Sequence, residues 1–163
     1  MAHREHKTPN VTPRKRRPST VVLHGTGSSA RSAEAWLTDP DSRVSAHYLI
    51  SKSGEVVRMA DPFRETTWHA GRGAGPEGKG VNAYSVGIEL ENANTGKDPY
   101  PKAQLDALVG LLRKLRSAIP SLVWLTMHKE VCLPPGRKTD PVGLDLEPLA
   151  EASGLAPWRR KNR

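Results

Sequence analysis

The chain has 163 residues, 36% of them apolar, and its 25 Lys and Arg against 17 Asp and Glu give a net charge of +8. This length suits one domain that buries a core without disulfides, and a single cysteine excludes a disulfide-rich scaffold. The sequence contains no run of ~18 apolar residues, which argues against a membrane-spanning helix. It also has no repeating period of 20–50 residues, which argues against a repeat array.

The positive charge is concentrated at the two ends of the chain. Residues 1–20 carry six Lys or Arg and one acid, and 157–163 carry four and no acid, whereas 21–156 carry fifteen basic and sixteen acidic residues. We therefore predict a basic flexible arm over 1–18, a folded domain over 19–156 and a basic tail over 157–163. Such ends are typical of contact with a polyanion and are equally consistent with solvated, disordered tails.

The N-terminal segment is charged and has no apolar stretch of the kind that forms a secretory signal. This pattern predicts a cytoplasmic protein, which reaches a cell wall only if it is released from the cell. A monomer is the default expectation for a chain of this size.

Hydrophobic patterning predicts alternating strands and helices. In chain order we expect a strand over 20–24, a helix over 32–37, a hairpin of 46–51 with 55–60, a long Gly-rich loop over 64–83, a strand over 85–91, a helix over 101–119, a strand over 123–127 and a helix over 144–152. This order predicts a single α/β domain with a mixed sheet.

Two histidines follow short apolar strands, at the positions where binding sites tend to form. His24 ends the first strand and His128 follows the strand over 123–127. Two imidazoles and a carboxylate make a three-ligand zinc site that keeps a position open for water, and Asp140, twelve residues after His128, is the candidate carboxylate. The alternative is a pair of ordinary hydrogen-bonded histidines. Cys132 fits a buried structural thiol better than a ligand.

Two carboxylates share the polar face of the strand over 85–91. Glu89 and Glu91 alternate with apolar residues, so both side chains lie opposite the apolar face. A carboxylate beside a metal-activated water can act as general base and acid. Spacing alone does not show which of the two is the candidate base. The alternative is that both are solvent-exposed strand carboxylates without a catalytic role.

Six segments together carry a resemblance to a known family. They are VVLHGT (21–26), VSAHYLISKSGEV (44–56), TWHAG (67–71), NAYSVGIELEN (82–92), MH (127–128) and RKTDP (137–141). In this order they resemble the zinc-dependent N-acetylmuramoyl-L-alanine amidases of type 2, which include muropeptide-recycling amidases, phage amidase lysozymes and peptidoglycan recognition proteins. The resemblance covers roughly residues 20–150.

The resemblance implies a mixed central sheet flanked by helices, with one zinc ion in a surface groove. It implies cleavage of the amide between the lactyl group of N-acetylmuramic acid and L-alanine of the stem peptide. Position by position, it implies His24, His128 and Asp140 as zinc ligands, Glu89 as the catalytic carboxylate and Lys138 as the group that stabilises the oxyanion.

Other positions separate the branches of the family. Where one branch has a catalytic Tyr, this chain has Ala46, and Tyr48 falls on the opposite face of its strand. The resemblance therefore fits the branch that uses Glu and Lys, and His47 is expected to be structural.

Three residues are candidate substrate contacts. They are Arg137, Asn82 and His69, with Arg137 suited to the carboxylates of the stem peptide and local hydrogen bonding as the alternative for His69. Trp68, beside His69, is expected to be structural.

The leading functional prediction is a zinc amidase that acts on peptidoglycan or its fragments. The basic ends favour a phage-type endolysin in cell lysis, because they suit an anionic envelope. The alternatives are a cytoplasmic muropeptide-recycling amidase and a peptidoglycan-binding protein without catalytic activity. Nucleic acid is disfavoured as a partner, because the body between the two ends is nearly neutral.

Overall fold

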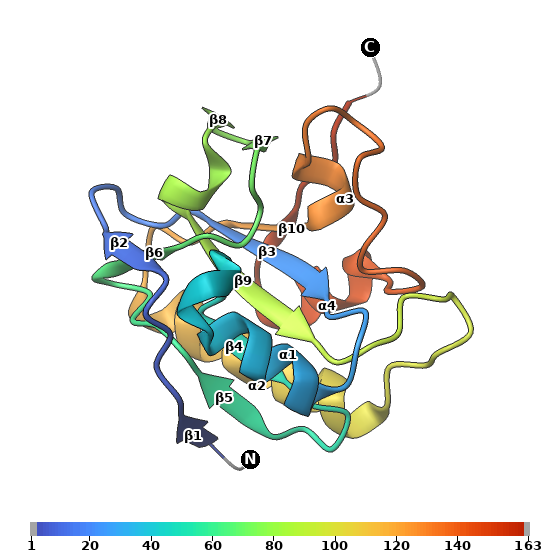
Figure 1. Cartoon of the computed structure of the whole chain (residues 1–163). Coiled ribbons are helices and arrows are strands. Elements are labelled where there is room, and N and C mark those ends of the chain that lie inside the picture. Colours follow the sequence, from blue (N-terminus) through green and yellow to red (C-terminus); the bar gives the residue numbers. More distant parts are fainter. Residues whose placement is uncertain (1–2, 162–163) are drawn as a thin grey trace.

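A computed structural model describes residues 3–161, which form a seven-stranded mixed sheet with helices on both faces (Figure 1). In spatial order the strands are β1 (His3–Glu5), β5 (Val56–Arg58), β4 (Tyr48–Ile50), β9 (Ser85–Leu90), β3 (Thr20–Gly25), β10 (Trp124–Met127) and β11 (Ala156–Pro157). β4 and β5 pair antiparallel, and all other neighbours pair parallel. The predicted α/β fold with a mixed, helix-flanked sheet is confirmed.

The remaining elements connect these strands. The helices are α1 (Ala30–Thr38), α2 (Lys102–Ala118), α3 (His128–Val131) and α4 (Leu146–Ser153), with 3-10 turns η1 (Pro40–Ser42) and η2 (Val81–Tyr84). Two small antiparallel ladders join β2 (Val11–Pro13) to β6 (Glu65–Thr67) and β7 (Ala74–Gly75) to β8 (Gly78–Lys79). Strands of two or three residues carry no detectable period, so β6, β7 and β8 were not separable from the loop predicted over 64–83.

The main core lies between the sheet and the pair α2–α4. The apolar face of α2 is buried there, with Leu108 and Leu112 fully inaccessible to solvent. Truncating such a leucine to alanine typically costs about 2–5 kcal/mol. On the opposite face, α1 buries Ala33 and Leu37 against Leu49. The sheet is therefore covered on both sides, with α1 in front of it and α2 behind it in Figure 1.

The N-terminal segment packs against the body, so the prediction of a flexible arm is wrong for residues 3–18. β1 pairs with β5 and β2 pairs with β6. Asn10 is 4% exposed, and its side-chain amide donates to the carbonyls of Asp39 (2.8 Å) and Val44 (2.9 Å). The sequence pattern does not reveal the pairing of β1 and β2, because these strands are short and polar and their partners lie some fifty residues away in the chain.

The C-terminal segment is also attached to the body. Its Trp158 N–H donates to the carbonyl of Leu125 (2.8 Å). Arg159 forms ion pairs with Glu147 (2.8 Å) and Glu130 (3.4 Å). Over 157–160 the basic tail is therefore packed rather than free, while residues 1–2 and 162–163 of the predicted ends lie outside the described residues. Within 3–161, no helix combines the length and apolarity that crossing a bilayer requires.

The buried contacts of Asn10 predict a measurable role in stability. In Asn10→Ala, the carbonyls of Asp39 and Val44 lose their donor in a part-buried position. We expect the free energy of unfolding to fall by about 1–3 kcal/mol, measured by denaturant titration. The matched control is Lys7→Ala at a neighbouring exposed position, which should change it by less than about 0.5 kcal/mol. Equal effects of the two variants would contradict a structural role for this segment.

Candidate metal centre

Three adjacent parallel strands bring the polar side chains of the site together. His24 on β3 lies directly opposite Glu89 on β9. On the other side of β3, Leu23 lies opposite Met127 of β10, so His128, the first residue of α3, follows beside His24. Parallel strands end at the same edge of the sheet, so three segments that are distant in sequence meet there.

The alternation of side chains separates this site from the core. Along β9, one set of positions enters the core beneath α2 and α4: Val86, Ile88 and Leu90. The alternate positions face the site side: Ser85, Gly87 and Glu89. Along β3, Leu23 likewise faces the core and His24 faces the site. The predicted strand polarity thus holds, although the polar face is buried under loops instead of exposed.

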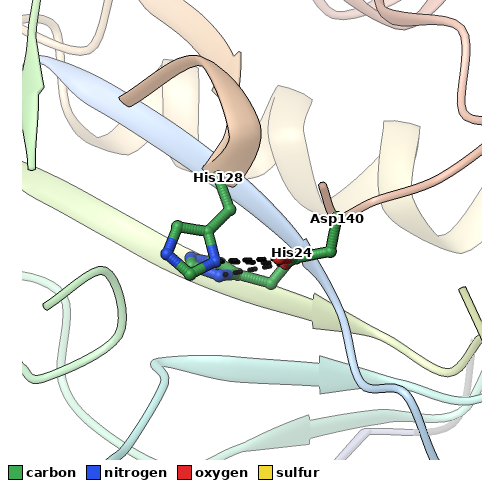
Figure 2. Close-up of side chains that lie close together, drawn as sticks. All are labelled: His24, His128 and Asp140. Carbon is green, nitrogen blue, oxygen red and sulfur yellow. Dashed lines mark hydrogen bonds and ion pairs between the residues drawn. The ribbon is translucent and has the colours of Figure 1, made fainter. Parts of the chain in front are cut away.

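His24, His128 and Asp140 form a compact group that could hold a metal ion (Figure 2). Each offers one donor atom, and these atoms lie within 4.8 Å of one another. Asp140 comes from the loop after α3 and approaches His128 Nδ1 at 3.1 Å and His24 Nδ1 at 3.7 Å. The backbone N–H of Gly25 donates to Asp140 Oδ2 at 3.3 Å, which orients that carboxylate.

The hydrogen bonding of His128 fits a shared cation. Its Nε2 lies 3.3 Å from the carbonyl oxygen of Ala70, which can only accept, so Nε2 carries the hydrogen. In a neutral imidazole the lone pair of Nδ1 then points at the carboxylate of Asp140. A lone pair and a carboxylate repel each other unless a positive charge lies between them. The donor set of two imidazoles and one carboxylate therefore suits a divalent ion.

Glu89 lies beside this group, and its side chain is mostly buried, with 13% of its surface exposed. Its Oε1 is 3.9 Å from His24 Nδ1, and its Oε2 is buried without a hydrogen-bond partner among residues 3–161. Burial and, to a lesser extent, the negative charge of Asp140 raise the pKa of Glu89 to about 8, although the positive charge of Lys138 opposes them. A buried carboxylate with a perturbed pKa in a cleft is a candidate for proton transfer.

Two of the candidate ligands, Asp140 and His24, have shifted pKa values as well. Burial raises the pKa of Asp140, but the close contacts with His128 and His24 and the backbone N–H of Gly25 outweigh this and bring it to about 2. Burial, followed by the neighbouring His128, lowers the pKa of His24 well below its usual range. Asp140 is therefore ionised and His24 neutral near pH 7, which are the forms that bind metals.

A cavity of about 290 Å³ opens onto these residues. Lys138 lines it together with His24, Glu89, His128 and Asp140. Two tryptophans also line it, Trp68 after β6 and Trp36 on α1, and Trp36 is 58% exposed. Trp36 is a cavity residue that the sequence motifs do not predict. The signal that could have found it is a large aromatic side chain on the outer face of a short helix next to a strand end.

The three predicted substrate contacts lie in different surroundings. His69 lines the cavity but is only 9% exposed. Asn82 accepts a hydrogen bond from the N–H of Ala70 (3.0 Å), and Arg137 donates to the carbonyls of Ala70 and Arg72 (both 3.1 Å). Asn82 and Arg137 are not among the residues that line the cavity. In this structure they hold the loop beside His128, and their contact with substrate stays a prediction.

Three further residues are placed as expected. His47 is fully buried and accepts the N–H of Gly87 at Nδ1 (3.0 Å), which is a structural role. Tyr48 faces the core on the other side of the sheet. Cys132 is buried and does not belong to the group of candidate ligands.

Comparison with known proteins gives consistent matches. Residues 14–143 match the family described as N-acetylmuramoyl-L-alanine amidase. The 1,6-anhydro-N-acetylmuramyl-L-alanine amidase AmpD of Escherichia coli is 39% identical over 100 residues, which cover 61% of this chain and 52% of AmpD. The N-acetylmuramoyl-L-alanine amidase AmiD of Escherichia coli is 30% identical over 158 residues, covering 87% of this chain and 55% of AmiD. The chain thus spans about half the length of the curated relatives it matches.

Solved structures agree with these matches. A crystal structure of a selenomethionine AmpD derivative superposes with a TM-score of 0.77 at 29% identity, covering 92% of this chain and 93% of AmpD. Escherichia coli AmiD, solved with the substrate anhydro-N-acetylmuramic acid-L-Ala-D-gamma-Glu-L-Lys, superposes with a TM-score of 0.74 at 28% identity and covers 88% and 60% of the two chains.

Proposed function

The chain belongs to the N-acetylmuramoyl-L-alanine amidase family, and from this premise we propose that it hydrolyses the amide between the lactyl group of N-acetylmuramic acid and L-alanine. The observation that carries the proposal is the convergence of His24, His128 and Asp140 beside the buried carboxylate of Glu89. A recognition protein without activity has no need of a buried, unpartnered carboxylate at this position.

We propose that His24, His128 and Asp140 hold one zinc ion. Zinc bound about 2.0–2.1 Å from each donor in a tetrahedron requires donor atoms roughly 3.3 Å apart, and the separations of 3.1 Å and 3.7 Å from Asp140 lie on either side of this value. When bound, the ion lowers the pKa of its water towards ~7 and polarises the substrate carbonyl.

Glu89 would transfer the proton. Its carboxylate accepts a proton from the attacking water and returns it to the nitrogen of the leaving L-alanine amine, because both steps need a group whose pKa is near the working pH. The pKa of about 8 in its buried surroundings is near that range. Glu91 is not equivalent, since its oxygens accept the backbone N–H groups of Ala30 (3.0 Å) and Lys52 (2.8 Å).

Lys138 would stabilise negative charge on the reacting carbonyl oxygen. It lines the same cavity as Glu89 and lies two residues before Asp140. A positive charge fixed beside a developing oxyanion in a low-dielectric site lowers the barrier more than it would in water.

The relatives support a small soluble substrate over intact wall. The curated AmpD proteins are named for 1,6-anhydro-N-acetylmuramyl-L-alanine, and AmiD was solved with an anhydro-N-acetylmuramic acid peptide. The basic ends that favoured an endolysin pack against the body over the described residues, which weakens the argument for free arms. We therefore propose that the chain acts on anhydromuramyl peptides, as in muropeptide recycling.

The first prediction from the proposed function concerns the catalytic carboxylate. Glu89→Gln keeps the shape of the side chain but cannot transfer the proton, so kcat should fall by about 10²- to 10⁴-fold. Mass spectrometry of an anhydromuramyl peptide after incubation measures release of the peptide with a free L-alanine amine. Glu151→Gln, on the exposed face of α4, is the control and should retain full activity. If Glu89→Gln cleaves at the native rate, Glu89 is not the base.

The second prediction concerns the ion. We expect one zinc per chain by elemental analysis, loss of product formation on chelation, and recovery when zinc is added back. Asp140→Asn should weaken zinc binding at least tenfold, because a neutral amide replaces the anionic ligand. The control is Asp106→Asn, which removes an exposed carboxylate on α2. Full activity with no bound metal would refute the zinc proposal.

A third prediction concerns the basic segment before β3. Residues 14–17 line a groove of about 430 Å³ with exposed Phe63, at the end of β3 opposite His24. The alternative of a wall-degrading enzyme predicts that this groove contacts anionic envelope polymers and leaves the catalytic cavity open. Lys15 and Arg17 are exposed and have no ion-pair partner among residues 3–161.

The double variant Lys15→Glu with Arg17→Glu tests this role without removing any strand. Co-sedimentation with purified cell wall at low salt should fall at least several-fold, because binding to a polyanion scales with the number of neutralised charges. Cleavage of a soluble anhydromuramyl peptide should be unchanged. Unchanged sedimentation would show that the groove does not bind the wall.

A further inference from the structure

We propose that His69 and Ser85 are positioning residues that fix the tautomer and the ring orientation of His24, so that its Nδ1 presents a lone pair to the metal. The proposal rests on the zinc site proposed above and extends it outward by two buried side chains. Figure 2 shows the group whose donor geometry this would control.

A chain of buried hydrogen bonds leads away from His24. Its Nε2 lies 2.9 Å from Nδ1 of His69, and Nε2 of His69 lies 2.9 Å from Oγ of Ser85. Ser85 Oγ lies 2.6 Å from the carbonyl oxygen of Val81. His24 and Ser85 are at most 1% exposed and His69 is 9% exposed, so bulk water does not compete for these bonds.

The donor and acceptor of every bond in this chain follow from the bond between Ser85 and Val81. The carbonyl oxygen of Val81 has no hydrogen, so the Ser85 hydroxyl donates to it and uses its only hydrogen there. Ser85 Oγ must then accept from His69, which places a hydrogen on His69 Nε2. A neutral His69 has a bare Nδ1, and it can only accept. His24 therefore donates from Nε2, and its Nδ1 carries the lone pair.

The orientation that results points at the candidate centre. His24 Nδ1 is the atom that faces Asp140 Oδ2 at 3.7 Å and Glu89 Oε1 at 3.9 Å. Metal-binding histidines commonly donate their other N–H to a second group, which fixes the tautomer and raises the basicity of the ligand. The unusual feature here is that the second group is itself an imidazole, anchored in turn by a hydroxyl.

The sequence of β9 leaves space for the ring of His69. A Cβ on Gly87 would lie 2.4 Å from Cγ of His69, so only glycine leaves room for the ring. Ser85, Gly87 and Glu89 occupy alternate positions of β9 and so share one face of the strand. One strand thus anchors His69, makes space for its ring and carries the candidate base.

The experiment compares variants that remove or keep the acceptor at His69. His69→Phe retains a ring but accepts no hydrogen bond, and the dissociation constant for zinc, from chelator competition on the full chain, should rise about 10- to 100-fold. His69→Asn keeps an oxygen where Nδ1 lies and should stay within about threefold of the native constant. Ser85→Ala removes only the hydroxyl and should give an intermediate loss.

A spectroscopic readout separates positioning from packing. Nitrogen-15 NMR of histidine-labelled full chain, with and without zinc, reports which ring nitrogen of His24 carries hydrogen. We expect hydrogen on Nε2 in the native chain without zinc and a mixture of tautomers in His69→Phe. His47→Asn is the matched control, because it removes another fully buried imidazole, whose ring centroid is 6.3 Å from that of His69, and should leave zinc affinity unchanged.

Each outcome decides one proposal. Native zinc affinity in folded His69→Phe, or hydrogen on Nδ1 of His24 in the native chain without zinc, would overturn the positioning role. If His69→Phe does not fold, native affinity in Ser85→Ala together with an unchanged His24 tautomer would overturn it. A chain with the expected tautomer and zinc affinity that cleaves no muramyl amide would refute the proposed function and leave this inference standing.

Discussion

The site depends on the register of three parallel strands. Pairing of β9, β3 and β10 sets Glu89 beside His24 and His24 beside the start of α3. A one-residue slip would turn His24 into the core beneath α2 and α4, because side chains alternate between the two faces of a strand. The apolar positions Leu23 and Ile88 resist such a slip, since each would lose its place in the core. Burial of apolar side chains on one face thus holds the polar groups in line on the other.

Burying so many polar groups is costly unless each has a partner. His128 donates to the carbonyl of Ala70, and Asp140 accepts from the backbone of Gly25. His24 is held through His69 to Ser85. The buried Oε2 of Glu89 is an exception among residues 3–161, and it lies where a reacting group would be expected. A network that is satisfied except at its reactive end is rigid before substrate arrives, which is the condition for electrostatic stabilisation of a transition state.

The packed ends of the chain change how its charge is interpreted. Arg14 donates into the backbone of Glu65, Ala83 and Ser85, and Arg159 pairs with Glu147. Part of the basic excess is therefore structural, and within residues 3–161 exposed side chains such as Lys7, Lys15 and Arg17 form no ion pair. Packed ends agree better with the proposed role on anhydromuramyl peptides, which is based on the named relatives, than with an enzyme that binds the cell wall through long free arms.

The sequence by itself determined the α/β order, the strand ends that carry His24 and His128, and the polar face that carries Glu89, because these depend on local periodicity. It also supported Asp140 through the resemblance of its loop. The resemblance favoured Glu89 over Glu91 as the candidate base, and the tertiary structure adds a physical reason, because it engages Glu91 with the backbone N–H groups of Ala30 and Lys52. The place of His69 behind His24, the packing of residues 3–18 and the position of Trp36 at the cavity were likewise set by contacts between segments far apart in the chain. Such contacts depend on strand register and loop closure, and no local pattern of residues encodes them.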